Sequence, residues 1–149
     1  MINKILRFGL ISLVLILLQI LLFNNIQFSG YVNPYIYLMI ILLLPAGIQP
    51  WLLLLIAFAT GMIIDFTSDT PGIHAAATVL AAFSRPYLLR LIAPRDGYEA
   101  GLQLSMADYG FRWAFFYTTI IQLIHHTALF FLEVFRLEGF FRTILRILL

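Results

Sequence analysis

The sequence contains no cysteine and few charged side chains. It has 149 residues, of which none is Cys and 11% are Asp, Glu, Lys or Arg. The absence of cysteine excludes disulfides, zinc–thiolate sites and thiol nucleophiles. The scarcity of charge is unlike a soluble domain, in which about a quarter of the residues are charged. The net charge of +2 is too small to indicate a nucleic-acid partner, so none is expected.

The sequence also lacks the common catalytic motifs. It contains no H-E-x-x-H metal motif, no G-x-S-x-G nucleophile motif and no phosphate-binding G-x-x-x-x-G-K. Asp65 and Asp69 have the spacing of neighbours on one helical face, but Thr67, Ser68 and Pro71 predict that no helix continues there. We therefore expect neither an enzyme nor a metal or cofactor site.

Apolar residues dominate what is present. Hydrophobic side chains make up 62% of the chain. A soluble chain of this length leaves about a third of its unfolded surface exposed after folding, so it could not bury this many apolar side chains. Because exposed apolar surface is stable in lipid, the composition predicts one integral membrane domain over residues 1–149. Because apolar runs alternate with short polar breaks, we expect an all-α polytopic membrane protein.

Five apolar runs predict the transmembrane helices. They cover residues 8–23, 31–44, 51–64, 72–92 and 111–135. The second and third runs are shorter than the about 20 residues that cross a bilayer, so they either span twice or form a re-entrant hairpin. A sixth helix begins near residue 140 and is incomplete at residue 149. We therefore predict five to six helices in one bundle, with either a longer natural chain or an interfacial end.

The fourth run differs from the others because it is rich in small residues. These are Gly72, Ala75, Ala76, Ala77, Ala81, Ala82 and Ser84. Small side chains let helix backbones approach closely in lipid, where packing drives association. We expect this helix at the centre of the bundle. After Arg85 and Pro86, residues 87–92 are predicted to lie along the interface as a short amphipathic segment.

The positive charges predict the orientation in the membrane. If the N-terminus is cytoplasmic, one side receives Lys4, Arg7, Arg85, Arg90, Arg95 and Arg112. The turns expected on the other side, residues 24–33 and 65–71, contain neither Lys nor Arg. This distribution follows the positive-inside rule and predicts a cytoplasmic N-terminus. Arg136 and Arg142 are exceptions, since they would flank an outer turn.

The polar segment GMIIDFTSDTPGIH connects the third and fourth predicted helices. Thr70 and Pro71 are expected to be the N-cap and the first residue of the fourth helix, because a hydroxyl accepts from amides that lack a helical partner. Asp69 is expected to cap the same helix or to interact favourably with its positive end. This interpretation makes the segment a polar turn outside the bilayer.

Asp65 and His74, in the same segment, have two interpretations. Asp65 is expected at the end of the third helix, and His74 one turn inside the fourth. The two side chains either form a structural pair, or they contact a partner chain or relay a proton. Ionisable residues in membrane helices commonly mark such functional sites. The sequence leaves both interpretations open.

A second polar group lies in the fifth predicted helix. At about 100° per residue, one stripe contains Thr119, Gln122, His126 and Glu133, with His125 at its edge. We expect this stripe to be buried and to form interhelical hydrogen bonds. No zinc site is expected, because adjacent histidines diverge by about 100° on a helix and no third ligand has suitable spacing.

Four stretches in order carry a family resemblance. They are NPYIYLMIILLLP, residues 51–99, DYGFRW and LIHHTALFFLEVFR. Together they resemble MreD, the rod shape-determining membrane protein family, in the form found in Bacteroidota. The most specific elements are G-x-x-x-D, P-G-x-H and R-P, which here comprise Gly61, Asp65, Pro71, Gly72, His74, Arg85 and Pro86.

The resemblance implies a fold, a location and partners. It implies a bacterial inner-membrane protein of about six helices, similar in fold to the substrate-binding components of vitamin transporters. Its partners would be MreC, the MreB filament, and the glycosyltransferase and transpeptidase of wall synthesis, within membrane lipid. The main hypothesis is a non-enzymatic scaffold of the cell-elongation complex that binds MreC and helps to position peptidoglycan synthesis and control cell shape.

Candidate partner contacts follow from this hypothesis. They are Asp65, Asp69, Gly72, His74, Arg85, Arg90 and Arg95. The alternative hypothesis is a transporter component that binds a vitamin or lipid precursor in a pocket lined by His74, Gln122 and His126. A third hypothesis, an intramembrane enzyme, would need a second ionisable group beside Asp65 with open access.

Overall fold

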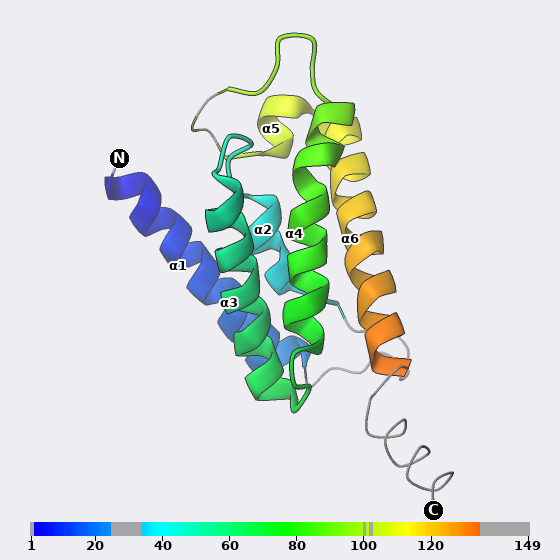
Figure 1. Ribbon diagram of the computed structural model, residues 1–149. Coiled ribbons are helices and arrows are strands. Elements are labelled where there is room, and N and C mark those ends of the chain that lie inside the picture. The colour runs from blue at the N-terminus through cyan, green and yellow to red at the C-terminus, as the bar shows by residue number, and fades with distance from the viewer. Residues whose placement is uncertain (1, 25–33, 100, 102, 135–149) are drawn as a thin grey trace, which may run out of the picture.

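The computed structural model describes residues 2–24, 34–99, 101 and 103–134, and every regular element in those residues is helical (Figure 1). In chain order the elements are α1 (Ile2–Leu18), η1 (Gln19–Phe23), η2 (Ile36–Leu38), α2 (Met39–Leu42), α3 (Pro50–Ser68), α4 (Ile73–Leu91), α5 (Met106–Tyr109) and α6 (Phe111–Val134). The all-α prediction is confirmed for this part of the chain. The predicted helix from about residue 140 lies outside the described residues, as do Arg136 and Arg142.

Three helices in the described part are long and apolar enough to cross a membrane. Their spans are Ile5–Phe23, Pro50–Ser68 and Phe111–Glu133. Many apolar side chains on α1 are exposed: Ile5 is 71% exposed and Leu10 63%. Side chains of this kind are stable against lipid tails, which are as apolar as they are.

The helix α4 lies between α3 and α6 and is antiparallel to both (Figure 1). Where α3 and α4 cross, a Cβ atom on Gly61 would lie 2.4 Å from the Cα of Ala75, so only glycine permits this approach. Further along α4, Ala77, Ala81 and Ala82 are fully buried. The prediction that small residues place this helix at the centre of the bundle is confirmed.

The helix α4 also continues through Pro86 to Leu91. The predicted separate interfacial segment over residues 87–92 is therefore wrong. Proline removes one backbone donor from a helix interior, but Leu88 and Leu89 beyond it are buried against the core. Packing of these side chains outweighs the lost hydrogen bond, which membrane helices tolerate where neighbouring groups cover the backbone.

The segment between α1 and α3 is not a helix of spanning length in the residues described. It consists of η2 and α2, which together cover residues 36–42. Its side chains are among the most buried in the protein, including Tyr37, Leu38 and Ile41 at 0% exposure. Of the two alternatives for residues 31–64, the described residues show no spanning helix before α3, whereas α3 itself is long enough to cross a membrane. Irregular backbone at membrane depth is stable where protein covers it, as α1, α3, α4 and α6 do here.

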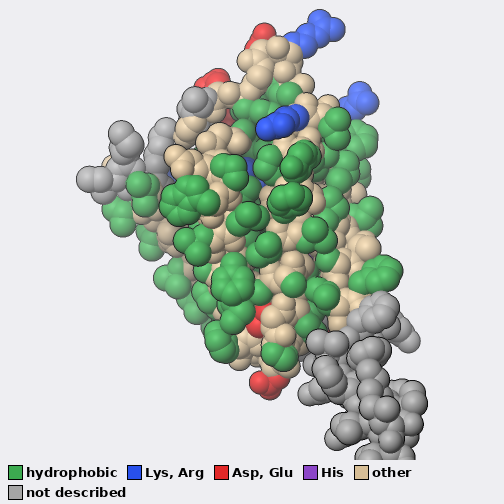
Figure 2. Space-filling model, in the orientation of Figure 1, with side chains coloured by type: hydrophobic (Ala, Val, Ile, Leu, Met, Phe, Trp, Pro, Cys, Tyr) green, Lys and Arg blue, Asp and Glu red, His purple; other side chains and the backbone are tan. Residues whose placement is uncertain are grey.

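Positive side chains gather at one end of the bundle. Arg7 near the start of α1, Arg90 near the end of α4, Arg95 in the following loop and Arg112 at the start of α6 are all exposed. Figure 2 shows Lys and Arg colours at this upper end and an apolar face below it. Asp69 is exposed at the opposite end, where α3 leads into α4. This polarity agrees with the predicted sidedness of the charges.

Candidate functional site

Asp65, in the last turn of α3, holds the first turn of α4. Its Oδ1 accepts hydrogen bonds from the backbone N–H of His74 and the hydroxyl of Thr70, both at 2.9 Å, and its Oδ2 accepts from the N–H of Ala75 at 2.9 Å. The side chain is only 4% exposed. These amides belong to the group at a helix start that has no intrahelical acceptor. Asp65 therefore caps α4 from the preceding helix.

This contact replaces the cap that the sequence predicted. The helix α4 begins at Ile73, after an N-cap Gly72 with φ 81° and no side-chain capping bond. The expectation that Thr70 and Pro71 start the helix is therefore wrong. Thr70 instead donates to Asp65. The two oxygens of this carboxylate each accept from one amide of the first turn, so no local hydroxyl is needed as the cap.

The end of α3 differs from the prediction as well. The helix continues through Thr67 and Ser68, and the Thr67 hydroxyl donates to the carbonyl of Ile64 at 2.9 Å, within the same helix. Asp69 forms the C-cap in the left-handed conformation, with φ 51°. Asp and Asn visit this region more readily than most residues. The expectation that Asp69 caps α4 is wrong, because it ends α3 and its side chain is exposed.

His74 lies directly beside Asp65 inside the bundle. Its Nδ1 is 3.1 Å from Asp65 Oδ1 and 2.9 Å from Thr70 Oγ1. The Thr70 hydroxyl gives its one proton to Asp65, so it accepts from His74, whose Nδ1 carries a hydrogen. His74 is 6% exposed. The structural-pair interpretation accounts for this geometry, and neither side chain offers a surface to a partner.

Tyr37 connects three elements deeper in the bundle. Its hydroxyl lies 3.0 Å from Thr78 Oγ1 on α4 and 2.8 Å from His125 Nε2 on α6. Thr78 donates its one proton to the carbonyl of His74 at 2.7 Å. Thr78 must then accept from Tyr37, and Tyr37 from His125 Nε2–H. The remaining ring nitrogen, His125 Nδ1, is a buried acceptor without a hydrogen-bond partner among the described residues.

Tyr35 completes this cluster with its ring. The ring centroid lies 5.4 Å from that of His74, 5.6 Å from that of His125 and 5.2 Å from that of His126, each in an edge-on arrangement. Sequence reasoning missed Tyr35 and Tyr37, because they stand in the apolar run NPYIYLM. The available signal was that a buried tyrosine hydroxyl normally requires a partner.

The polar stripe predicted on α6 is only partly buried. Thr119 and Glu133 are exposed, Gln122 and His126 are half-buried, and His125 alone is fully buried. The prediction is therefore wrong for Thr119 and Glu133. The buried face of α6 is the neighbouring row Tyr117, Ile121, His125 and Leu129. Helical periodicity groups residues on one face, but it does not say which face packs against protein.

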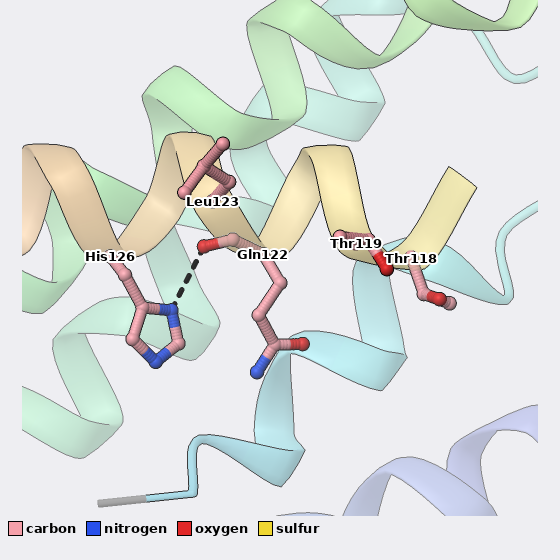
Figure 3. A pocket seen from close by; sticks show the side chains of 5 residues that line it. All are labelled: Thr118, Thr119, Gln122, Leu123 and His126. Carbon is pink, nitrogen blue, oxygen red and sulfur yellow. Dashed lines mark hydrogen bonds between the residues drawn. The ribbon is translucent and has the colours of Figure 1, made fainter. Parts of the chain in front are cut away.

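Three residues of that stripe, Thr119, Gln122 and His126, line a pocket of about 430 Å³ (Figure 3). Thr118, Thr119, Gln122 and His126 contribute its polar groups, and His126 Nδ1 lies 2.9 Å from the carbonyl of Gln122. His74 does not line this pocket. The expectation of one pocket shared by His74, Gln122 and His126 is wrong, because His74 is directed toward Asp65.

Arg85 forms a second buried polar centre at the other end of α4. Its Nε donates to the Tyr117 hydroxyl at 2.7 Å, Nη1 donates to the carbonyl of Pro45 at 3.3 Å, and Nη2 donates to the carbonyl of Leu44. Tyr117 donates in turn to the carbonyl of Leu42 at 3.1 Å. Arg85 is 1% exposed. It joins α4 and α6 to the end of α2, and it offers almost no exposed surface to a protein partner.

The other predicted contact residues divide by exposure. Asp69, Arg90 and Arg95 are exposed, and Gly72 is half-buried. Arg90 lines a pocket with Tyr98, whose hydroxyl donates to the carbonyl of Leu89 at 2.9 Å. Burial raises the pKa of the Tyr98 phenol above its usual value, so this donor stays protonated at neutral pH.

Neither a metal centre nor a known relative explains these contacts. The described residues contain no group of three or more His, Cys, Asp or Glu side chains placed to hold a metal ion. Comparison with family models, curated proteins and solved structures gives no match to this chain.

Proposed function

We propose that this chain is a non-enzymatic membrane scaffold that binds a partner's membrane segment and helps to position peptidoglycan synthesis during cell elongation. One observation carries the proposal. The buried ionisable side chains Asp65, His74 and Arg85 are engaged by backbone groups and hydroxyls of the same bundle. They stabilise helix–helix contacts and leave an apolar outer surface, which suits a protein that acts through its helix faces.

The partner in this proposal is MreC, as the resemblance of the sequence to MreD implies. The chain would lie in the bacterial inner membrane with a cytoplasmic N-terminus, cross it five to six times, and be similar in fold to vitamin-transporter binding components. Exposed arginines at one end of the bundle support this orientation. Asp69 at the opposite end would face the periplasm.

A groove between α4 and α6 supports the docking of a partner helix. It has a volume of about 650 Å³, and small residues on both helices, Ala76 and Ala128, line it together with Leu80 and Leu123. Small residues facing a groove let another helix approach closely, and such packing drives association in lipid. We assign the membrane segment of MreC to this groove.

The test fills the groove and measures recovery of MreC. Ala76→Leu should reduce the MreC that co-purifies with the chain from native membranes by about tenfold, since about 1.4 kcal/mol of lost packing has this effect. Ala59→Leu is the matched control, because Ala59 is exposed on α3 and outside the groove. Equal recovery of MreC with both variants would remove the groove from the proposal.

A second function is favoured by the pocket beside Gln122 and His126. Its converging polar groups resemble those of a small-molecule site, so a transporter component that binds a vitamin or lipid precursor is the rival proposal. That rival predicts a saturable thermal shift with such a ligand, abolished by Gln122→Leu. The scaffold proposal predicts no saturable shift and unchanged MreC recovery in the same variant.

A further inference from the structure

A second pocket, which we call the arginine pocket, lies where the α2–α3 turn meets the end of α4. Its volume is about 270 Å³, and Arg85, Arg90 and Tyr98 line it together with apolar side chains such as Ile48 and Leu89. It is separate from the α4–α6 groove and from the pocket beside Gln122. Two arginines thus line one small pocket, where their like charges repel each other unless an anion lies between them.

The charge of Arg85 has no counter-ion among the residues that the structure describes. The one contact of this kind found there, between His74 Nδ1 and Asp65, lies at the far end of α4. All acceptors of Arg85 are neutral: the Tyr117 hydroxyl and the carbonyls of Leu44 and Pro45. A buried charge without a neutralising partner is strongly unfavourable. The site is therefore electrostatically complementary to an anion.

The guanidinium also has a donor to spare. It carries five N–H groups, and they make four hydrogen bonds: one from Nε, one from Nη1 and two from Nη2. One Nη1–H therefore makes none of these bonds, and Arg85 is among the residues that line the pocket. Arg90 lies five residues further along α4, lines the same pocket and is exposed, so it supplies a second cation at the rim. Arginine is the side chain best suited to phosphate oxygens.

The position of the arginine pocket indicates where the anion comes from. The exposed arginines lie at this end of the bundle. The inference rests on the proposed orientation, in which this end faces the cytoplasmic leaflet, and that leaflet is anionic. Trp51 and Tyr87 directly follow two lining residues, Pro50 and Pro86, in the sequence, and they are 62% and 57% exposed. Exposed aromatic side chains of this kind are typical of the headgroup level of a bilayer. Apolar lining beside the arginines suits the glycerol and acyl part of a lipid.

We propose that the arginine pocket binds the phosphate group of an anionic membrane lipid. The group recognised is a phosphate oxyanion, which a lipid headgroup and free phosphate both carry. Arg85 would hold it from inside the pocket and Arg90 at the rim. Inorganic phosphate offers the same oxyanion from solution, but it has no apolar part to pack against Ile48 and Leu89. The lipid form is therefore the one that the lining favours, and it does not depend on which protein partner the scaffold binds.

The test measures lipid retained by the purified chain. The protein is reconstituted in nanodiscs of phosphatidylcholine with a minor share of phosphatidylglycerol, released, and analysed by native mass spectrometry. We expect one retained phosphatidylglycerol per chain in preference to phosphatidylcholine. Arg90→Gln should lower this occupancy by about tenfold, the effect of losing one charge-assisted hydrogen bond. Arg112→Gln is the matched control, exposed at the same end but outside the pocket.

Other outcomes would overturn the proposal. Equal loss in Arg90→Gln and Arg112→Gln would show diffuse surface attraction, and equal retention of both lipids would show no phosphate site selective for anionic lipid. Displacement by inorganic phosphate at the lipid's own concentration would assign the site to a soluble anion. Arg85→Gln should lose the lipid entirely, but the comparison of the two exposed arginines decides the question even if that variant does not fold.

Discussion

The carboxylate of Asp65 on α3 reaches the start of α4 and accepts a hydrogen bond from the backbone N–H of Ala75 at 2.9 Å. The Cα of the same Ala75 is the closest neighbour of any side chain added at Gly61. One residue of α4 is thus held both by a charged acceptor and by close backbone packing. The contact between α3 and α4 is therefore fixed at this residue by a hydrogen bond and by close backbone packing.

Replacing this acceptor should destabilise the protein. In Asp65→Asn the amide group places a donor where one of the α4 amides now donates, so we expect a loss of about 2 kcal/mol in the free energy of unfolding. Thermal unfolding in detergent measures it. Asp69→Asn is the control, because this exposed residue has φ 51°, which asparagine also tolerates. Equal destabilisation by both variants would contradict the capping role of Asp65.

The close crossing gives a second prediction. Gly61→Ala should separate α3 from α4 and lower the free energy of unfolding by about 1–3 kcal/mol, because the added methyl meets backbone that has no room to move. The comparison is Gly9→Ala on α1, where the new Cβ would have nothing within 4 Å. That variant should be neutral or slightly stabilising in the same unfolding experiment. A neutral Gly61→Ala would mean that the crossing is looser than described.

The Tyr37 hydroxyl should stabilise the bundle through Thr78 and His125. In Tyr37→Phe, Thr78 and His125 stay buried but lose their hydrogen bonds to the hydroxyl. We expect a loss of about 1–2 kcal/mol in the free energy of unfolding, as for other hydrogen bonds between membrane helices. Tyr87→Phe removes the same atom from a ring that is 57% exposed and should have little effect. If Tyr37→Phe costs nothing further once His125→Phe is in place, the two residues act as one unit. Equal stability of the two tyrosine variants would contradict this role.

Arg85 should not tolerate replacement by lysine. The guanidinium reaches Tyr117 through Nε and two carbonyls through its other nitrogens, and an ammonium group cannot match this fork. Arg85→Lys should therefore destabilise the protein by about 2 kcal/mol, whereas Arg112→Lys on the exposed surface should not. Hydrogen exchange at the end of α4 gives a local measure of the same loss, and unchanged protection there would contradict the prediction.

The helices that face lipid could be predicted from sequence because their signal is local. Long apolar runs indicated α1, α3 and α6, and small residues indicated the central position of α4. The segment around Tyr37 could not be assigned in this way, since a buried broken helix and a lipid-crossing helix are equally apolar. What distinguishes them is cover by neighbouring helices, which no single run encodes.

The polar contacts were less predictable for a related reason. Asp65 was identified as unusual, but its acceptor role depends on amides nine and ten residues later, across a turn. The bond between Tyr37 and His125 joins residues 88 apart in the chain. The partners of Arg85 were not predicted either, because they are two backbone carbonyls, which leave no mark in the sequence, and a tyrosine hydroxyl 32 residues later.

The proposal that this bundle is a scaffold is tested most directly by isolating the intact chain from native membranes in mild detergent and identifying the proteins and small molecules that accompany it. The account predicts that MreC is recovered in near-stoichiometric amount and that no vitamin or lipid precursor occupies the pocket beside Gln122. Recovery of transporter subunits or of a bound small molecule there, without MreC, would contradict it.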